Sequence, residues 1–132
     1  MGVTNMSGFV RYCPKLKTFP ALKMASVENV QGIFEGCESL ESVPLLDWSS
    51  VTNCGNAFYR CYALKNVGGF TGLAVSVSFV QSSALTRESV LNIFNGLATV
   101  SNVQTITLHP SVLALLSSAD RAIATDKGWT IN

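Results

Sequence analysis

Apolar and polar positions recur with a period of 24 residues along the first 80 residues of the chain. Three cysteines mark the step, at Cys13, Cys37 and Cys61. Five further columns share it, four apolar and one polar: Leu16/Leu40/Leu64, Phe19/Val43/Val67, Val3/Val27/Val51, Met6/Val30/Cys54 and Asn5/Asn29/Asn53. Self-similarity at a fixed period is typical of repeat proteins, in which each unit buries its apolar face against its neighbours.

The period of 24 falls within the range of leucine-rich repeats, in which a short strand and a compact return form one coil. The sequence therefore predicts an α/β fold, namely a leucine-rich-repeat β/α solenoid with about three 24-residue coils in residues 1–80. Larger C-terminal β-α coils in residues 81–132 are expected to cap it. The strand is expected at residues 40–43 and the return at 33–37. Pro44 would end the strand, because proline cannot donate to a ladder.

Two of the columns are expected to have a structural role, as rows of equivalent side chains stacked from one turn to the next. Asparagine both donates and accepts, so Asn5, Asn29 and Asn53 are expected to be buried and to satisfy free backbone groups of successive turns. A ligand-binding ladder is the alternative interpretation. The cysteine column is expected to lie in the core, because cysteine is among the most buried residue types.

In the last third of the chain, the 24-residue spacing of apolar and polar positions is less regular. Three apolar residues first alternate like a strand: Val75, Val77 and Phe79. Thr86 is the expected N-cap of a helix that ends near Gly96, where a left-handed cap is common. Residues 105–108 alternate like a strand, and one further helix is expected to open at Pro110 or Ser111 and to close at Lys127-Gly128. Residues 129–131 are expected to form a last strand.

Several stretches resemble a known family. VTNMS at residues 3–7, SVTN at 50–53 and FEGCESL at 34–40 resemble the BspA-like leucine-rich repeats of bacterial surface proteins. The resemblance covers about residues 2–80. The chain departs from the pattern where Gly68 takes the place of a proline. The resemblance implies an adhesion or interaction module at a bacterial surface, and it carries over no catalytic residues.

The amino-acid composition argues against some classes of binding partner. Only 13% of the residues are charged, the net charge is +1, and serine, threonine and asparagine outnumber the charged residues two to one. Nucleic-acid binding needs clustered lysine and arginine, so it is not expected. No apolar run is long enough to span a membrane, and no signal peptide is visible. A neutral polar surface suits an extracellular or cell-surface location.

The cysteines and the single histidine give no recognisable catalytic pattern. The four cysteines, Cys54 included, lack the paired spacing of a zinc site, and disulfides remain the alternative to buried thiols. His109 follows a predicted strand, and nothing near it in the sequence indicates that a nucleophile and an acid converge on it in space. The sequence therefore predicts no enzyme, no catalytic residue, no metal and no cofactor.

Two groups of side chains are candidates for partner binding. Met24 and Trp48 occupy one column, next to Lys23 and Asp47. If this column points outward, Trp48 would anchor a partner, because exposed tryptophan is frequent at interfaces. If it points inward, it belongs to the core. A second candidate patch lies on the return side of the turns: Tyr12, Tyr59, Tyr62 and Arg60.

Two functions are therefore expected as alternatives. The first is a non-enzymatic adhesion module of a bacterial cell-surface protein, which binds a protein or a glycan. The second is a structural or assembly domain of a prophage-encoded fibre or tail protein. In the second case the uncovered N-terminal coil would be a site of self-association.

Overall fold

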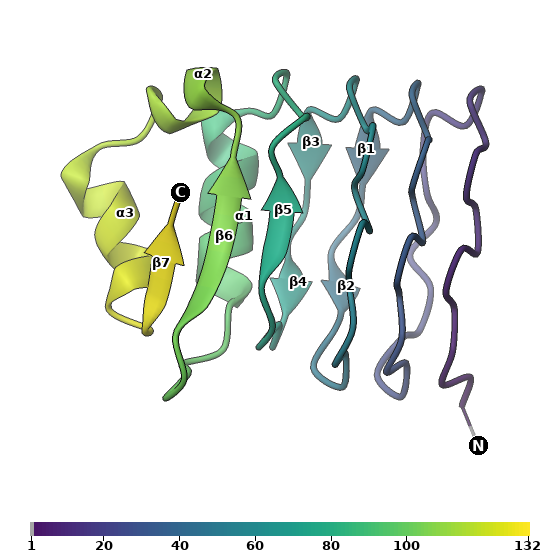
Figure 1. Cartoon of the computed structure of the whole chain (residues 1–132), viewed down its shortest axis with the longest axis horizontal. Coiled ribbons are helices and arrows are strands. Elements are labelled where there is room, and N and C mark those ends of the chain that lie inside the picture. The colour runs from purple at the N-terminus through teal and green to yellow at the C-terminus, as the bar shows by residue number, and fades with distance from the viewer. Residues whose placement is uncertain (1) are drawn as a thin grey trace.

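The computed structural model describes residues 2–132 and contains short strands and three helices (Figure 1). The elements follow in this order: β1 (Ser42–Val43), β2 (Leu46–Asp47), β3 (Asn66–Val67), β4 (Phe70–Thr71), β5 (Val77–Phe79), α1 (Arg87–Gly96), β6 (Gln104–Leu108), α2 (Pro110–Leu113), α3 (Ser118–Thr125) and β7 (Trp129–Ile131). Among the described residues, no helix has the length and apolar character needed to cross a membrane.

The predicted fold class, a leucine-rich-repeat solenoid, is wrong. The described strands form three small open parallel sheets, β1–β3, β2–β4 and β5–β6–β7, and no continuous sheet runs through them. Proline and glycine residues that interrupt the extended segments explain why the strands are short. Pro44 separates β1 from β2, and Gly68 and Gly69 separate β3 from β4. Proline cannot donate to a ladder and glycine weakens a strand, so neither run extends beyond two residues.

The 24-residue spacing nevertheless determines which segments are adjacent. Ser42 lies opposite Asn66, and Leu46 lies opposite Phe70, both in parallel register. Isolated parallel bridges join Asn5 to Asn29 and Asn29 to Asn53. In Figure 1 these segments run side by side in two layers, one that contains β5, β6 and β7 and one that contains β1 to β4. Segments far apart in sequence therefore share one core between the layers.

Aromatic rings fill much of that core. The ring of Phe58 stacks on Phe34 at 5.4 Å and on Phe79 at 4.4 Å between centroids. Trp48 lies 4.3 Å from Phe70, measured in the same way. All five side chains are almost completely buried. Phe34 and Phe58 are one 24-residue step apart, so the stack ties successive turns together.

Helix α1 covers the edge of β3 that no strand pairs with. Its N-cap is Thr86, as predicted from the sequence, and Ser89 lies in its first turn. The Ser89 hydroxyl donates to the Lys65 carbonyl at 2.7 Å and accepts the Val67 N–H at 2.8 Å. Asn92 adds a bond to the Val67 carbonyl at 3.0 Å. Helix side chains thus satisfy edge groups that would otherwise be buried without partners.

The predicted second helix is broken in two. Ser117 caps α3 and forms a reciprocal capping box with Asp120, which starts a new helix where a continuous one was expected. Asp120 also accepts two hydrogen bonds from the Arg87 guanidinium, both at 2.8 Å, and this pair ties α3 to α1. The Arg87 hydrogen bonds and the Ser117 N–H lower the pKa of Asp120 to about 2. The expected left-handed cap at Gly96 is also wrong, since Leu97 ends α1 in an extended conformation.

Candidate functional site

The first predicted partner-binding group is not a surface site. Trp48 is 0% exposed and Met24 is 1% exposed, so both belong to the core and the prediction that they anchor a partner is wrong. The alternation of side chains explains the error. Leu46 and Trp48 point inward, and Asp47, between them, points toward solvent.

The charged members of that group line a shallow hollow. Lys23 is exposed, and Lys23 and Asp47 flank a depression of about 370 Å³. Asp47 accepts the Ser49 hydroxyl at 2.6 Å and the Ser49 N–H at 3.0 Å, and these bonds lower its pKa. Because its carboxylate already closes this turn, Asp47 has a structural role. The residues lining the hollow are Leu22, Lys23, Met24, Ala25, Leu45, Asp47 and Thr71.

The asparagine column is structural but not buried. The side-chain oxygens of Asn5, Asn29 and Asn53 accept the backbone N–H two residues on, at 2.9, 2.9 and 3.1 Å. Asn5 and Asn53 are exposed and Asn29 is half-buried, so the expected burial is wrong. The amides form turns of the kind that asparagine makes with its own backbone, and water reaches them.

Removing one of these amides should therefore have a modest effect. We expect Asn53→Ala to lower the free energy of unfolding by about 0.5–1.5 kcal/mol, the usual net contribution of one hydrogen bond. Asn53→Asp keeps the accepting oxygen and should stay close to the wild type. Urea titration measures both. A loss of several kcal/mol for Asn53→Asp would show that the side chain is buried after all.

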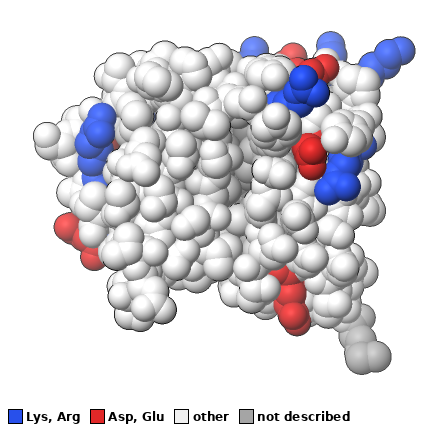
Figure 2. Space-filling view, in the orientation of Figure 1, with Lys and Arg blue, Asp and Glu red and all other residues white. Residues whose placement is uncertain are grey.

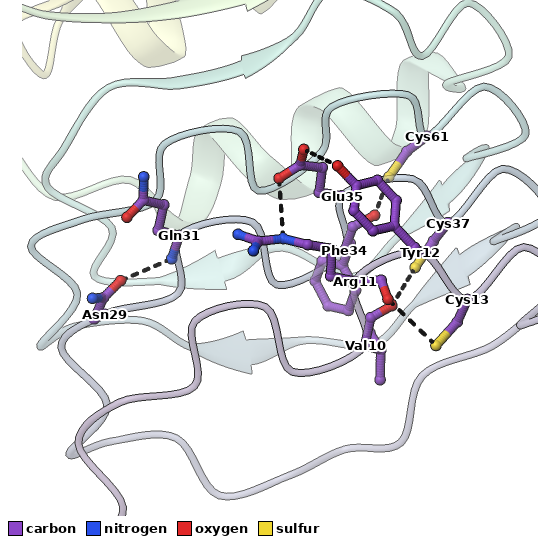
Figure 3. A network of polar contacts seen from close by, with 10 residues as sticks. All are labelled: Val10, Arg11, Tyr12, Cys13, Asn29, Gln31, Phe34, Glu35, Cys37 and Cys61. Carbon is purple, nitrogen blue, oxygen red and sulfur yellow. Dashed lines mark hydrogen bonds and ion pairs between the residues drawn. The ribbon is translucent and has the colours of Figure 1, made fainter.

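The cysteine column lies in the core as predicted, except at its first member (Figure 3). Cys37 and Cys61 are buried, and their thiols donate to the carbonyls of Val10 and Phe34, at 3.0 and 3.2 Å. Burial raises the pKa of Cys37, and that of Cys61 to about 12. Cys13 is only half-buried. The buried thiols are inert packing groups, because their thiolates are disfavoured.

The second predicted patch is at the surface. Tyr12, Tyr59 and Tyr62 are 61%, 47% and 44% exposed, and Arg60 is exposed beside them. We call these four residues the tyrosine face. Parallel backbone bonds join the three turns involved: Tyr12 N–H donates to the Glu35 carbonyl at 2.7 Å, and Gly36 N–H donates to the Tyr59 carbonyl at 2.9 Å. The turn spacing therefore brings the tyrosines onto one side of the molecule.

Glu35 fixes one edge of the tyrosine face (Figure 3). The Tyr12 hydroxyl donates to one carboxylate oxygen at 3.0 Å, and Arg11 Nε lies 3.2 Å from the other. The bond to Glu35 raises the pKa of Tyr12. The Tyr12 ring lies over Gly36, where an added Cβ would collide with it. Glycine at this position thus makes room for the ring.

Arg60 fixes the other edge. Its backbone has a positive φ of 66°, at the position that Gly36 and Tyr12 occupy one and two turns earlier. Its N–H donates to the Gln81 side chain at 2.6 Å. The hydrogen bond between its guanidinium and Tyr62 raises the pKa of Arg60. These contacts hold an arginine among exposed tyrosines, a combination enriched where proteins bind partners.

Charged side chains are unevenly spread over the face of the molecule drawn in Figure 2. Figure 2 shows acidic and basic side chains interleaved toward the end that carries the N-terminus, whereas much of the remaining face is neutral. The tyrosine face has the Arg11–Glu35 ion pair at one margin and Arg60 beside the Gln81 side chain at the other. A small hollow of about 60 Å³ adjoins it, lined by Asn56, Phe58, Tyr59, Ser78, Val80 and Gln81.

Comparison with known proteins gives no match. No family model, no curated protein and no solved structure is significantly similar to the chain. The geometry of the surface therefore carries the functional argument.

Proposed function

We propose that the protein is a non-enzymatic binding module that recognises a protein or a glycan through the tyrosine face. The observation that carries this proposal is the exposure of Tyr12, Tyr59 and Tyr62 on the first and third of three successive turns. Tyrosine offers a large rigid contact surface with a polar end and loses little conformational entropy on binding. The ring of Tyr12 is already held by Glu35, so part of the face is ordered before a partner arrives.

The setting of this module is also a proposal. The resemblance of VTNMS and FEGCESL to BspA-like repeats favours adhesion at a bacterial cell surface, outside the cell. The low share of charged residues and the abundance of small neutral polar ones are compatible with that location. No catalytic role forms part of the proposal.

Substitution of two tyrosines tests the proposal. An array of defined glycans and a panel of purified extracellular-matrix proteins serve as probes for the wild type. For each probe that binds, we expect Tyr59→Ala/Tyr62→Ala to weaken the affinity by about tenfold or more, because tyrosines at binding hot spots contribute at least that much. Surface plasmon resonance measures the change.

The matched control removes an exposed apolar side chain elsewhere. Leu115 is 50% exposed and lies in the connection between α2 and α3. Leu115→Ala should leave binding unchanged, and circular dichroism should show that all variants are folded. A double tyrosine variant that binds as tightly as the wild type would contradict the proposed site.

The alternative is a structural or assembly domain, as in a prophage-encoded fibre or tail. One observation favours it. Val3 and Phe9, at the N-terminal end of the molecule, are 64% and 57% exposed. Exposed apolar groups gathered at one end are typical of contact surfaces. This second function needs no ligand at the tyrosine face.

A further inference from the structure

The backbone hydrogen bonds between successive turns are interrupted inside the molecule, between residues 54–60 and β5. At the preceding step, three N–H groups donate to carbonyls of the next turn at 2.9 to 3.0 Å: Val30 to Asn53, Gly32 to Gly55 and Phe34 to Ala57. One turn later, the equivalent N–H groups have no acceptor within residues 2–132: Cys54, Asn56 and Phe58. Described chain flanks this break on both sides, since residues 54–60 run beside β5 in the same layer (Figure 1). No further turn of the chain can therefore fill it.

Two adjoining hollows lie along the break, with volumes of about 200 Å³ and about 60 Å³. Asn56 and Ser78 line both hollows, so the two form one depression, which we call the slot. Phe58 and Tyr59 lie on the same side of it as Asn56, and Thr107 of β6 lies beyond Ser78 on the other side.

Hydrogen bonds close the slot at both ends. At one end the Cys54 thiol donates to the Ser76 carbonyl at 3.1 Å. At the other end the Arg60 N–H donates to the Gln81 side chain at 2.6 Å. An extended polypeptide cannot run through a depression that is bridged in this way. A compact ligand such as a single ring fits its shape.

The groups inside the slot are polar and uncharged. None of the residues that line it carries a charge, so a charged ligand would lose its hydration without an opposite charge in return. The Asn56 amide and the Thr107 hydroxyl are free of hydrogen bonds within the described chain. Phe58 is 1% exposed, so its N–H is shielded from bulk water and needs an acceptor. Hydroxyl groups, which both donate and accept, match all of these groups.

Asn56 occupies a position where the two earlier turns have glycine. Its φ is 55°, close to the 63° of Gly8 and the 62° of Gly32. Asparagine is one of the few residues with a side chain that adopts this left-handed conformation readily. The turn thus keeps its backbone conformation and gains an amide where the two hollows join, although no hydrogen bond within the described chain uses that amide.

We propose that the slot binds one sugar unit of an uncharged glycan. Hydroxyl oxygens of the sugar accept the N–H groups of Asn56 and Phe58, and the Asn56 amide bonds a further hydroxyl. Tyr59 borders the slot and belongs to the tyrosine face, so the remainder of the glycan continues onto that face. This continuation rests on the function proposed above, whereas binding in the slot itself does not.

Titration with single sugars tests the slot. The probes are the methyl glycosides of glucose, galactose, mannose and N-acetylglucosamine, and methyl glucuronide is the charged probe. In amide NMR spectra, we expect saturable shifts of the Asn56 and Phe58 signals with at least one uncharged probe. No shift of these signals with any probe, or shifts with the glucuronide alone, would overturn the proposal.

Asn56→Gly separates binding from folding, because it restores the residue of the two earlier turns. The urea midpoint should stay close to that of the original chain. The affinity for the sugar should fall about threefold to tenfold, the loss that corresponds to one net hydrogen bond. An unchanged affinity would overturn the contact with the amide.

Ser78→Ile fills the slot from an exposed position of a strand, where a β-branched residue is tolerated. It should abolish the shifts of the Asn56 and Phe58 signals. The matched control is Thr130→Ile, at an exposed position of β7 outside both hollows, and it should retain them. Sugar binding that survives Ser78→Ile would overturn the slot.

The same variants distinguish this proposal from the proposed function. With a complete glycan as the probe, the slot is wrong if Ser78→Ile binds normally while Tyr59→Ala/Tyr62→Ala loses binding. If the double tyrosine variant binds normally while Ser78→Ile does not, the slot is supported and the tyrosine face is wrong.

Discussion

Replacing Trp48 with alanine is expected to destabilise the protein by about 3–5 kcal/mol, the usual cost of removing a large aromatic side chain from a core. Trp48 is 0% exposed, and its ring packs against Phe70 and Phe58. Because these neighbours belong to other turns, the cavity would open at the centre of the aromatic stack. Urea unfolding followed by circular dichroism measures the loss.

Trp48→Phe is the matched control. The indole Nε1 is buried and has no hydrogen-bond partner within residues 2–132. Phenylalanine keeps much of the ring and leaves no acceptor unpaired, so the loss should be well below that of alanine. If Trp48→Ala is instead as stable as the wild type, Trp48 lies at the surface and the inward direction of its side chain after β2 is wrong.

Replacing Gly68 with proline is expected to destabilise the protein by about 3 kcal/mol or more. The sequence pattern suggests the opposite, because Pro44 occupies the same place one turn earlier. The Gly68 N–H donates to the Val43 carbonyl at 2.9 Å, and proline would remove that bond. A Cβ at Gly68 would also collide with the backbone nitrogen of Leu45 and lie 2.9 Å from the Pro44 carbonyl carbon.

Two alanine variants separate these causes. Gly68→Ala keeps the N–H but adds the colliding Cβ, so it should also destabilise, though by less than proline. Gly55→Ala is the control, because a Cβ there would meet its nearest neighbour, the Asn53 side-chain oxygen, at an ordinary 3.5 Å. Its effect should stay within about 0.5 kcal/mol, as for most surface substitutions. Thermal unfolding of the three variants gives the comparison. A Gly68→Pro variant as stable as the wild type would contradict the backbone geometry at this turn.

The sequence predicts which segments of the chain lie side by side better than it predicts the architecture of the sheets. The 24-residue step correctly places Asn29 between Asn5 and Asn53, and it places Cys37 and Cys61 in the core. Local signals also suffice for α1, because the Thr86 cap and the apolar spacing after it agree. Each of these predictions depends on residues close in sequence or on a repeated pattern.

The errors concern features that depend on how segments meet in space. The direction of the Trp48 side chain depends on the alternation that continues from β2 into the next residue, and a column of aligned residues does not reveal it. A continuous sheet was expected because one strand per turn was assumed, whereas Pro44 and the glycines after Val67 keep the strands to two residues. The asparagines were expected to be buried because their column is regular, yet turns at a surface can be equally regular.

The tyrosine face was the weaker of the two sequence candidates for the same reason. Tyr59 and Tyr62 belong to one turn and Tyr12 to another, and only the stacking of turns brings them to one side. The signal that could have favoured it is Gly36, since glycine between Tyr12 and Arg60 in the same column leaves room for a large side chain.

The central claim is that Tyr12, Tyr59 and Tyr62 are exposed and that both tryptophans belong to the core, where Trp48 is 0% and Trp129 2% exposed. Photochemically induced nuclear polarisation tests it directly, because the dye polarises only those tyrosine and tryptophan rings that solvent can reach. The chain has three tyrosines and two tryptophans, so each signal can be assigned. We expect strong signals from Tyr12, Tyr59 and Tyr62 and none from Trp48 or Trp129. A strong Trp48 signal with silent tyrosines would contradict the account.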